Sequence, residues 1–146
     1  MIVSITIPDI EAGALSQLVA MFAKRIGEDL VHDIQMLLGT DEIYTLSPEY
    51  AAEKPHMKGF VRYKGGDQPL IFSGNMFEGV EWKLEGNTLT VGVADDAGVS
   101  ESTGEDYAEK WERKTQFLEK AYDRMGGDEH VLQVLEECLI EVFADA

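Results

Sequence analysis

The N-terminal part of the chain carries two different periodic patterns. Between residues 2 and 7, isoleucine and valine alternate with serine and threonine, and this period of two predicts a short strand. From Ile10 to Leu38, apolar residues recur every three or four positions, which predicts a long amphipathic helix that Gly39 ends. Gly27 is expected to weaken this helix. Such a helix has to bury its apolar stripe against a sheet or a neighbouring chain.

The clearest local element is a β-hairpin between residues 80 and 93. Apolar and polar residues alternate on both sides of Gly86 and Asn87, and this pair is typical of a tight turn. One face of the hairpin is therefore apolar and is expected to enter the core. Trp82 lies on that face, so we interpret it as a core residue rather than as an interface residue.

Less regular segments flank the hairpin. Residues 40–66 are interrupted by prolines and end in a Gly-Gly pair, and a brief strand is expected there around Phe60 and Arg62. Residues 94–104 are small, acidic and rich in serine, threonine and glycine, which predicts a mobile surface loop.

Two helices are predicted in the C-terminal part. The first covers Glu105–Met125, and the Gly126-Gly127 pair ends it. Its expected apolar stripe consists of Tyr107, Trp111, Leu118, Ala121, Tyr122 and Met125. The second begins at Asp128, and its expected stripe consists of Val131, Leu135, Leu139 and Val142.

These elements predict a single α+β domain over residues 1–146, because the chain shows no internal repeat and no domain boundary. The expected architecture is a long N-terminal helix, a small antiparallel sheet with a central β-hairpin, and C-terminal helices.

The net charge of the chain indicates which classes of partner it can bind. The 146 residues include 28 Asp and Glu against 12 Lys and Arg, a formal charge of −16. A nucleic-acid-binding protein neutralises phosphates with clustered Lys and Arg, so most of this surface should repel a duplex. The acid excess is heaviest after Ala94, whereas Lys54, Lys58, Arg62 and Lys64 form a locally basic segment. Separated charge suits contacts with further copies or with a complementary partner. The alternative is an ordinary acidic surface that keeps the protein soluble.

Cysteine content and hydropathy exclude two further classes. Cys138 is the only cysteine, so no internal disulfide can form, and its apolar neighbours indicate a buried thiol. No basic leader precedes an apolar run, and no apolar stretch approaches the roughly 20 residues of a helix that spans a bilayer. We therefore expect a soluble protein without membrane association, made in a reducing cytoplasm.

The sequence contains no catalytic, cofactor-binding or metal-binding motif. His32, His56 and His130 are scattered and lack the spacing of zinc ligands. The His32-Asp33 pair has the letters of a metal-phosphohydrolase dipeptide, but no second histidine cluster supports it, and we interpret it as helix surface. Residues 64–67 lack the residue order of a phosphate-binding loop and read better as a tight turn. We predict that the protein is not an enzyme and holds no cofactor.

Four phrases in the chain resemble, in order and spacing, the tail-completion proteins of tailed phages, a family also described as virion morphogenesis proteins. The phrases are Leu46–Lys54, Pro69–Met76 with its Ser-Gly-x-Met ending, Thr90–Gly92 and Tyr107-Ala108. The N-terminal strand and long helix are also similar. Residues 109–115 form a charged run where the family has Phe-Gly or Gly-Thr and then a Pro-Ala-Arg-Pro-Phe segment. Tail completion, neck and tail terminator therefore stay open as alternatives.

The resemblance implies a structural virion protein without catalytic residues, which completes the head–tail junction or the top of the tail. It implies a homo-oligomeric ring, such as a hexamer, in contact with neighbouring phage head, neck or tail proteins. Assembly would take place in the host cytoplasm. An acidic lumen would let genomic DNA pass without specific binding, because it repels phosphates.

The charge separation suggests how such a ring would close. Ring subunits meet head to tail, so opposite charge on the two edges favours closure, and large aromatic residues often anchor interfaces. We expect the basic segment on one edge and the acidic C-terminal helices on the other. The candidate interface residues are Tyr50, Lys54, Lys58, Arg62, Lys64, Tyr107 and Trp111.

A second interpretation needs no ring. A small acidic binding module, or an inhibitor that mimics DNA, would act on a basic partner as a monomer or dimer. Stoichiometry distinguishes the two interpretations.

Overall fold

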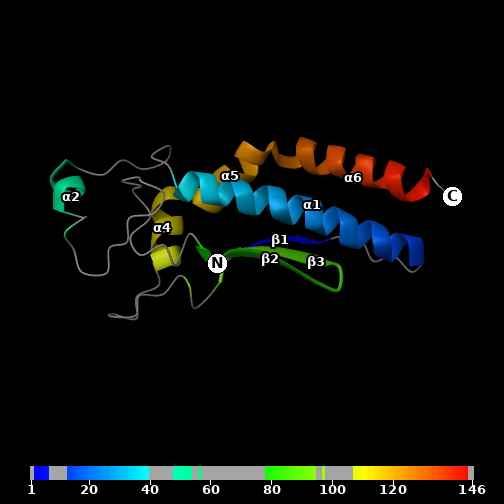
Figure 1. The fold of residues 1–146 in the computed structure, drawn as a ribbon, viewed down its shortest axis with the longest axis horizontal. Coiled ribbons are helices and arrows are strands. Elements are labelled where there is room, and N and C mark those ends of the chain that lie inside the picture. The colour runs from blue at the N-terminus through cyan, green and yellow to red at the C-terminus, as the bar shows by residue number, and fades with distance from the viewer. Residues whose placement is uncertain are drawn as a thin grey trace.

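One long helix lies between a small sheet and the C-terminal helices in the computed structural model (Figure 1). The structure describes residues 2–6, 13–39, 48–53, 56, 78–94, 97 and 107–144. Along the chain the elements are β1 (Ile2–Thr6), α1 (Gly13–Leu38), α2 (Pro48–Glu53), β2 (Val80–Glu85), β3 (Thr88–Val93), α4 (Tyr107–Thr115), α5 (Phe117–Met125) and α6 (Gly127–Phe143). The predicted α+β fold class is confirmed.

The three strands form an antiparallel sheet in the order β1-β3-β2. Val91 of β3 lies opposite Val3 of β1 and Trp82 of β2. In the same way, Leu89 of β3 lies opposite Ile5 of β1 and Leu84 of β2. These apolar rows form the inner face of the sheet, because successive side chains of a strand point to opposite faces. The predicted hairpin is confirmed, and Gly86 in its turn has φ 62°, a conformation that favours glycine.

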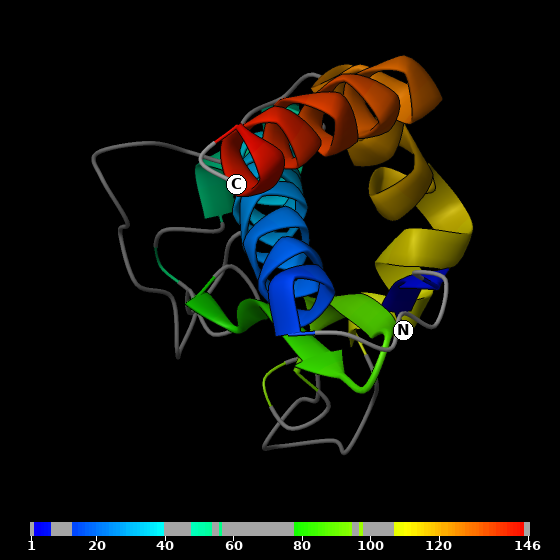
Figure 2. The same ribbon diagram turned by 90° about the vertical axis from the view of Figure 1, so that its right-hand side faces the viewer.

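Helix α1 is buried on two sides. Seen along its axis, the sheet lies on one side of α1 and α6 on the other, with α5 beside it (Figure 2). Its buried residues therefore recur on more than one face; they are Leu18, Phe22, Ala23, Ile26, Gly27, Leu30, Ile34, Leu37 and Leu38.

Gly27 brings α1 close to the sheet. A Cβ placed on Gly27 would lie 2.5 Å from Cγ of Trp82, so only glycine leaves room for the indole ring. Helix α1 continues through this position without a break. The glycine costs the helix some intrinsic propensity, yet it allows the half-buried Trp82 to pack against the core as predicted.

The prediction of one continuous helix over Glu105–Met125 is wrong. The helix stops at Thr115, and Gln116 adopts a left-handed conformation with φ 52° before α5 begins. The hydroxyl of Thr115 donates to the carbonyl of Trp111 at 2.6 Å. Phe117, which directly follows the break, is fully buried, although the predicted stripe omitted it.

The predicted stripe of the last helix is also wrong in part. The fully buried residues of α6 are Val134 and Cys138, which confirms the buried thiol, whereas Leu139 is exposed. The other three predicted residues, Val131, Leu135 and Val142, are half-buried and pack against the core, so Leu139 alone departs from the predicted stripe. The predicted glycine turn before α6 is present, with positive φ at Gly126 and Gly127.

Helix α2 was not predicted. Pro48 is its first residue, a position where the fixed φ of proline and its missing N–H cost the helix nothing. The strand expected around Phe60 and Arg62 lies outside the described residues, as does most of the loop expected over 94–104. None of the helices that the structure describes is both long and apolar enough to cross a membrane.

Candidate interaction surface

The predicted interface residues fall in different parts of the molecule. Tyr50 belongs to α2 and Tyr107 is the first residue of α4. The remaining candidates on the basic segment lie outside the described residues; they are Lys54, Lys58, Arg62 and Lys64. None of these four basic residues therefore belongs to a site that the structure describes.

Trp111 combines core and surface character. It is half-buried on α4 and packs against the core, and Nζ of Lys114 lies 5.1 Å from the centroid of its ring. A lysine at this distance from an indole forms a cation–π contact. Part of the Trp111 ring is therefore covered within the chain, and the rest is accessible. An interface role for Trp111 remains a prediction.

Helix α6 carries an exposed apolar strip that sequence reasoning missed. Four large apolar side chains are 39–64% exposed; they are Leu132, Leu139, Ile140 and Phe143. We call this set the α6 strip. Residues 132, 139 and 143 are separated by about two turns and one turn, so they share one side of the helix over a length of roughly 16 Å. Adjacent exposed apolar residues of this kind often mark an interaction site.

The charged residues of α6 are acidic only. The helix contains Asp128, Glu129, Glu136, Glu137 and Glu141, and it has no lysine or arginine. Helical spacing places residues 129 and 136 beside the α6 strip, between its central row and Ile140. The central row is thus apolar and has a negative margin, with Ile140 beyond this margin.

The opposite side of α6 is tethered to α1 by polar contacts. Arg25 of α1 donates to Glu141 at 2.5 Å, and the imidazole Nε2 of His130 lies 2.8 Å from Asp29 Oδ2. Between these pairs, Cys138 packs fully buried, and burial raises the pKa of its thiol. These polar contacts hold the side of α6 opposite the α6 strip against α1, so the α6 strip faces outward.

Helix α5 is joined to α1 and α6 in a similar way. Arg124 donates to Asp33 at 2.6 Å, and the hydroxyl of Tyr122 donates to Asp128 at 2.5 Å. The hydrogen bond from Tyr122 spans the turn at Gly126, so it fixes the start of α6 relative to α5. Burial and the neighbouring carboxylate of Asp128 raise the pKa of Tyr122 to about 12.

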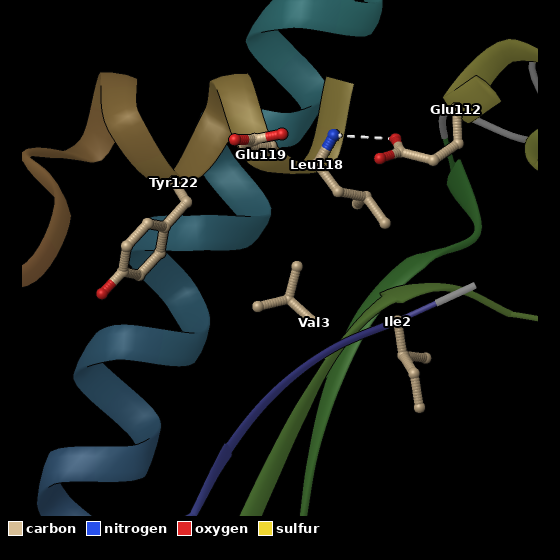
Figure 3. Close-up of a pocket in the computed structure, with 6 residues that line it drawn as sticks. All are labelled: Ile2, Val3, Glu112, Leu118, Glu119 and Tyr122. Atoms are coloured by element: carbon tan, nitrogen blue, oxygen red, sulfur yellow. Dashed lines mark hydrogen bonds between the residues drawn. The ribbon is translucent and has the colours of Figure 1, made fainter. Parts of the chain in front are cut away.

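An open hollow of about 460 Å³ lies between the edge strand β1 and the helices α4 and α5 (Figure 3). Its lining residues are Ile2, Val3, Glu112, Leu118, Glu119 and Tyr122. Glu112 accepts a hydrogen bond from the backbone N–H of Leu118 at 3.0 Å, and burial raises the pKa of its carboxyl group. Figure 3 shows the Tyr122 hydroxyl pointing away from Glu112. Glu112 thus bonds at the start of α5 and Tyr122 at the start of α6, and the two groups do not face a common reacting centre.

The histidines lie on separate elements. His32 is exposed on α1, His56 follows α2, and His130 is on α6. The exposed His32 agrees with the interpretation of this pair as helix surface, whereas the side chain of Asp33 is only 14% exposed and bonds to Arg124 of α5. Within the described ranges, no three His, Cys, Asp or Glu side chains are grouped so that they could hold a metal ion.

Comparison of the chain with models of known protein families, with curated proteins and with solved structures finds no match.

One sequence signal did point to the α6 strip. Leu132, Ile140 and Phe143 fall outside the predicted core stripe of the last helix, so α6 is apolar on two sides. A helix with this pattern needs two apolar contacts. The fold supplies one of them through α1 and α5.

Proposed function

We propose that this chain is a structural virion protein of the head–tail junction of a tailed phage. It assembles there as a ring around the DNA channel, in a tail-completion, neck or tail-terminator role. The proposal starts from the four segments of the sequence that resemble the tail-completion family in order and spacing. The N-terminal strand and the long helix add to this resemblance. It needs no catalytic residue and no cofactor.

The observation that best supports an assembly role is the α6 strip. Helix α6 lies on the outside of the molecule, with α1 between it and the sheet (Figure 2). Leu132 and Ile140 are each about two-thirds exposed, so neither side chain adds much to the core of a single chain. A protein that completes its apolar contacts only with neighbours accounts for this exposure.

The net charge fits passage of DNA through a ring. At −16 the chain has no excess of positive charge with which to retain phosphates. A negative channel would let DNA move without pausing at specific contacts.

The stoichiometry of the purified protein tests the proposal. Native mass spectrometry over a concentration series, with negative-stain imaging of large species, should find closed rings of about six or twelve copies. Trp111→Ala should reduce the ring fraction while the circular dichroism spectrum stays that of the folded monomer. Loss of the spectrum in this variant would instead assign Trp111 to the core.

The acidic binding module remains the second candidate, and the composition of α6 favours it as well. A helix with five carboxylates, four exposed apolar side chains and no lysine or arginine could also cover a basic protein. A strict monomer or dimer that forms a complex of fixed stoichiometry with a basic protein would support this candidate over the ring.

A further inference from the structure

The α6 strip sets narrow requirements for its partner. The partner has to offer apolar side chains to Leu132, Leu139 and Phe143 and positive charge to Glu129 and Glu136. Contact between two α6 helices meets the first requirement but not the second. It would bring carboxylates of both copies together along the margin, and like charges at an interface are unfavourable.

The chain itself contains a segment with the required chemistry. Residues 54–64 include four of its twelve Lys and Arg residues and no Asp or Glu. Apolar residues alternate with the basic ones, and they are Met57, Phe60, Val61 and Tyr63. No other stretch of this length in the sequence combines four basic residues with a complete absence of acids.

The described helix that precedes the basic segment lies far from the end of α6. Helix α2 ends at Glu53, directly before the basic segment, and Figure 1 shows it at the end far from the C-terminus of α6. When a surface and its complement occupy opposite ends, copies associate head to tail, and such contacts generate rings or open filaments.

We propose that the α6 strip and its acidic margin are the docking surface for residues 54–64 of a second copy. Apolar residues of the segment cover the four side chains of the α6 strip, including Leu132 and Ile140, and its basic residues pair with Glu129 and Glu136. This inference rests on the proposed ring and specifies its subunit contact. It replaces the general expectation of acidic helices against a basic edge with named residues on one helix.

A peptide of residues 54–64 with a fluorescent label tests the docking surface on the full-length protein. Fluorescence anisotropy should show binding at or below about 1 mM, weakening as salt is added. Leu132→Ser with Ile140→Ser should weaken binding by about tenfold or more. Glu129→Gln with Glu136→Gln should remove most of the salt dependence. Ile2→Ser is the matched control, because Ile2 is an exposed isoleucine on β1, away from α6.

Three results of this titration would overturn the inference. The first is no binding of the peptide up to about 1 mM. The second is equal binding to the variant that lacks Leu132 and Ile140. The third is equal binding of a peptide with the same residues in scrambled order, which would indicate a general basic partner instead of this segment.

Mixing two disabled variants tests the same contact between whole chains. Lys58→Glu with Arg62→Glu removes one edge, and Leu132→Ser with Ile140→Ser removes the other. Each variant alone should stay monomeric by sedimentation velocity, and the mixture should form a one-to-one pair through the two intact edges. A mixture that stays monomeric, or either variant associating alone like the unmodified chain, contradicts head-to-tail docking.

These results separate the inference from the proposed function. Rings that persist in the variant lacking Leu132 and Ile140 would refute the α6 contact and leave the ring standing. Peptide binding to the α6 strip without rings at any concentration would support the contact and count against the ring. Circular dichroism of each variant confirms that the exposed substitutions leave the fold intact.

Discussion

Helices α1 and α6 are both rich in apolar residues, yet the fold treats them differently. Nine residues of α1 are buried, because the sheet covers one side of the helix and α5 and α6 cover the other. Only Val134 and Cys138 are buried in α6, and four large apolar side chains point away from the core. Apolar spacing therefore shows which residues share a side of a helix, but not which side another element covers.

The two helices also differ in what holds them. Helix α1 packs against the sheet on one side and against α5 and α6 on the other, whereas α6 packs along one side and is also joined to α1 by the partly exposed polar contacts Arg25–Glu141 and His130–Asp29. Partly exposed polar contacts contribute little to stability, because water competes for both partners. We therefore expect α6 to open before α1 in local unfolding, and hydrogen exchange of the two helices measures this order.

A pair of isoleucines tests the comparison with the largest expected effect. Ile26 in α1 is 0% exposed and Ile140 in α6 is 61% exposed. Ile26→Ala leaves a cavity and should lower the free energy of unfolding by about 2–5 kcal/mol. Ile140→Ala should change it by less than about 0.5 kcal/mol. Urea unfolding followed by circular dichroism compares them, and similar losses would mean that the α6 strip is part of the core.

A pair of glycines tests the close approach of α1 to the sheet. Gly27→Ala places a methyl group against Trp82, and overpacking of this kind costs about 1–3 kcal/mol. The gain in helix propensity offsets up to about 1 kcal/mol of that cost. Gly13→Ala has nothing within 4 Å of the new Cβ and should not destabilise the protein. Equal free energies of unfolding in the two variants would show that the indole ring moves aside freely.

Tyr122→Phe tests the link between α5 and α6. Loss of the hydrogen bond to Asp128 should lower the free energy of unfolding by about 0.5–1 kcal/mol at neutral pH, since the pair is partly solvated. Burial and Asp128 raise the folded pKa to about 12 from an ordinary 10.0, so the unfolded chain loses its proton first. The contribution of Tyr122 is complete below pH 10 and is lost as the pH rises towards 12. The phenylalanine variant should lack this loss in unfolding experiments between these pH values.

Glu112→Gln has the smallest expected effect and the opposite sign. Burial raises the pKa of Glu112 above its ordinary 4.5, so the folded protein binds this proton more tightly than the unfolded chain. Ionisation therefore destabilises the fold as the pH rises through that range. Glutamine can still accept the Leu118 N–H, and it should raise stability at neutral pH by less than about 1 kcal/mol because solvent screens the carboxylate. The advantage should vanish in acid, and a variant less stable at every pH would contradict the assignment.

Local patterns in the sequence determined several parts of this protein. The period of two predicted β1 and the hairpin, and the helical period predicted α1, because both patterns follow from backbone geometry alone. The Gly126-Gly127 pair ended a helix as expected, since positive φ favours glycine. Together these local features were sufficient for the α+β class.

Which apolar residues pack together depended on the arrangement of elements that are distant in the sequence. The break at Gln116 accompanies the burial of Phe117, and no local pattern marks glutamine as a residue with positive φ. From the sequence, Gly27 was expected only to weaken α1. In the fold it leaves room for the indole ring of Trp82. Likewise, α6 has apolar residues on two sides, and the position of α1 determined which side was covered and which was left as the α6 strip. The reason is physical: periodicity is a property of a few neighbouring residues, whereas burial depends on which distant elements pack together.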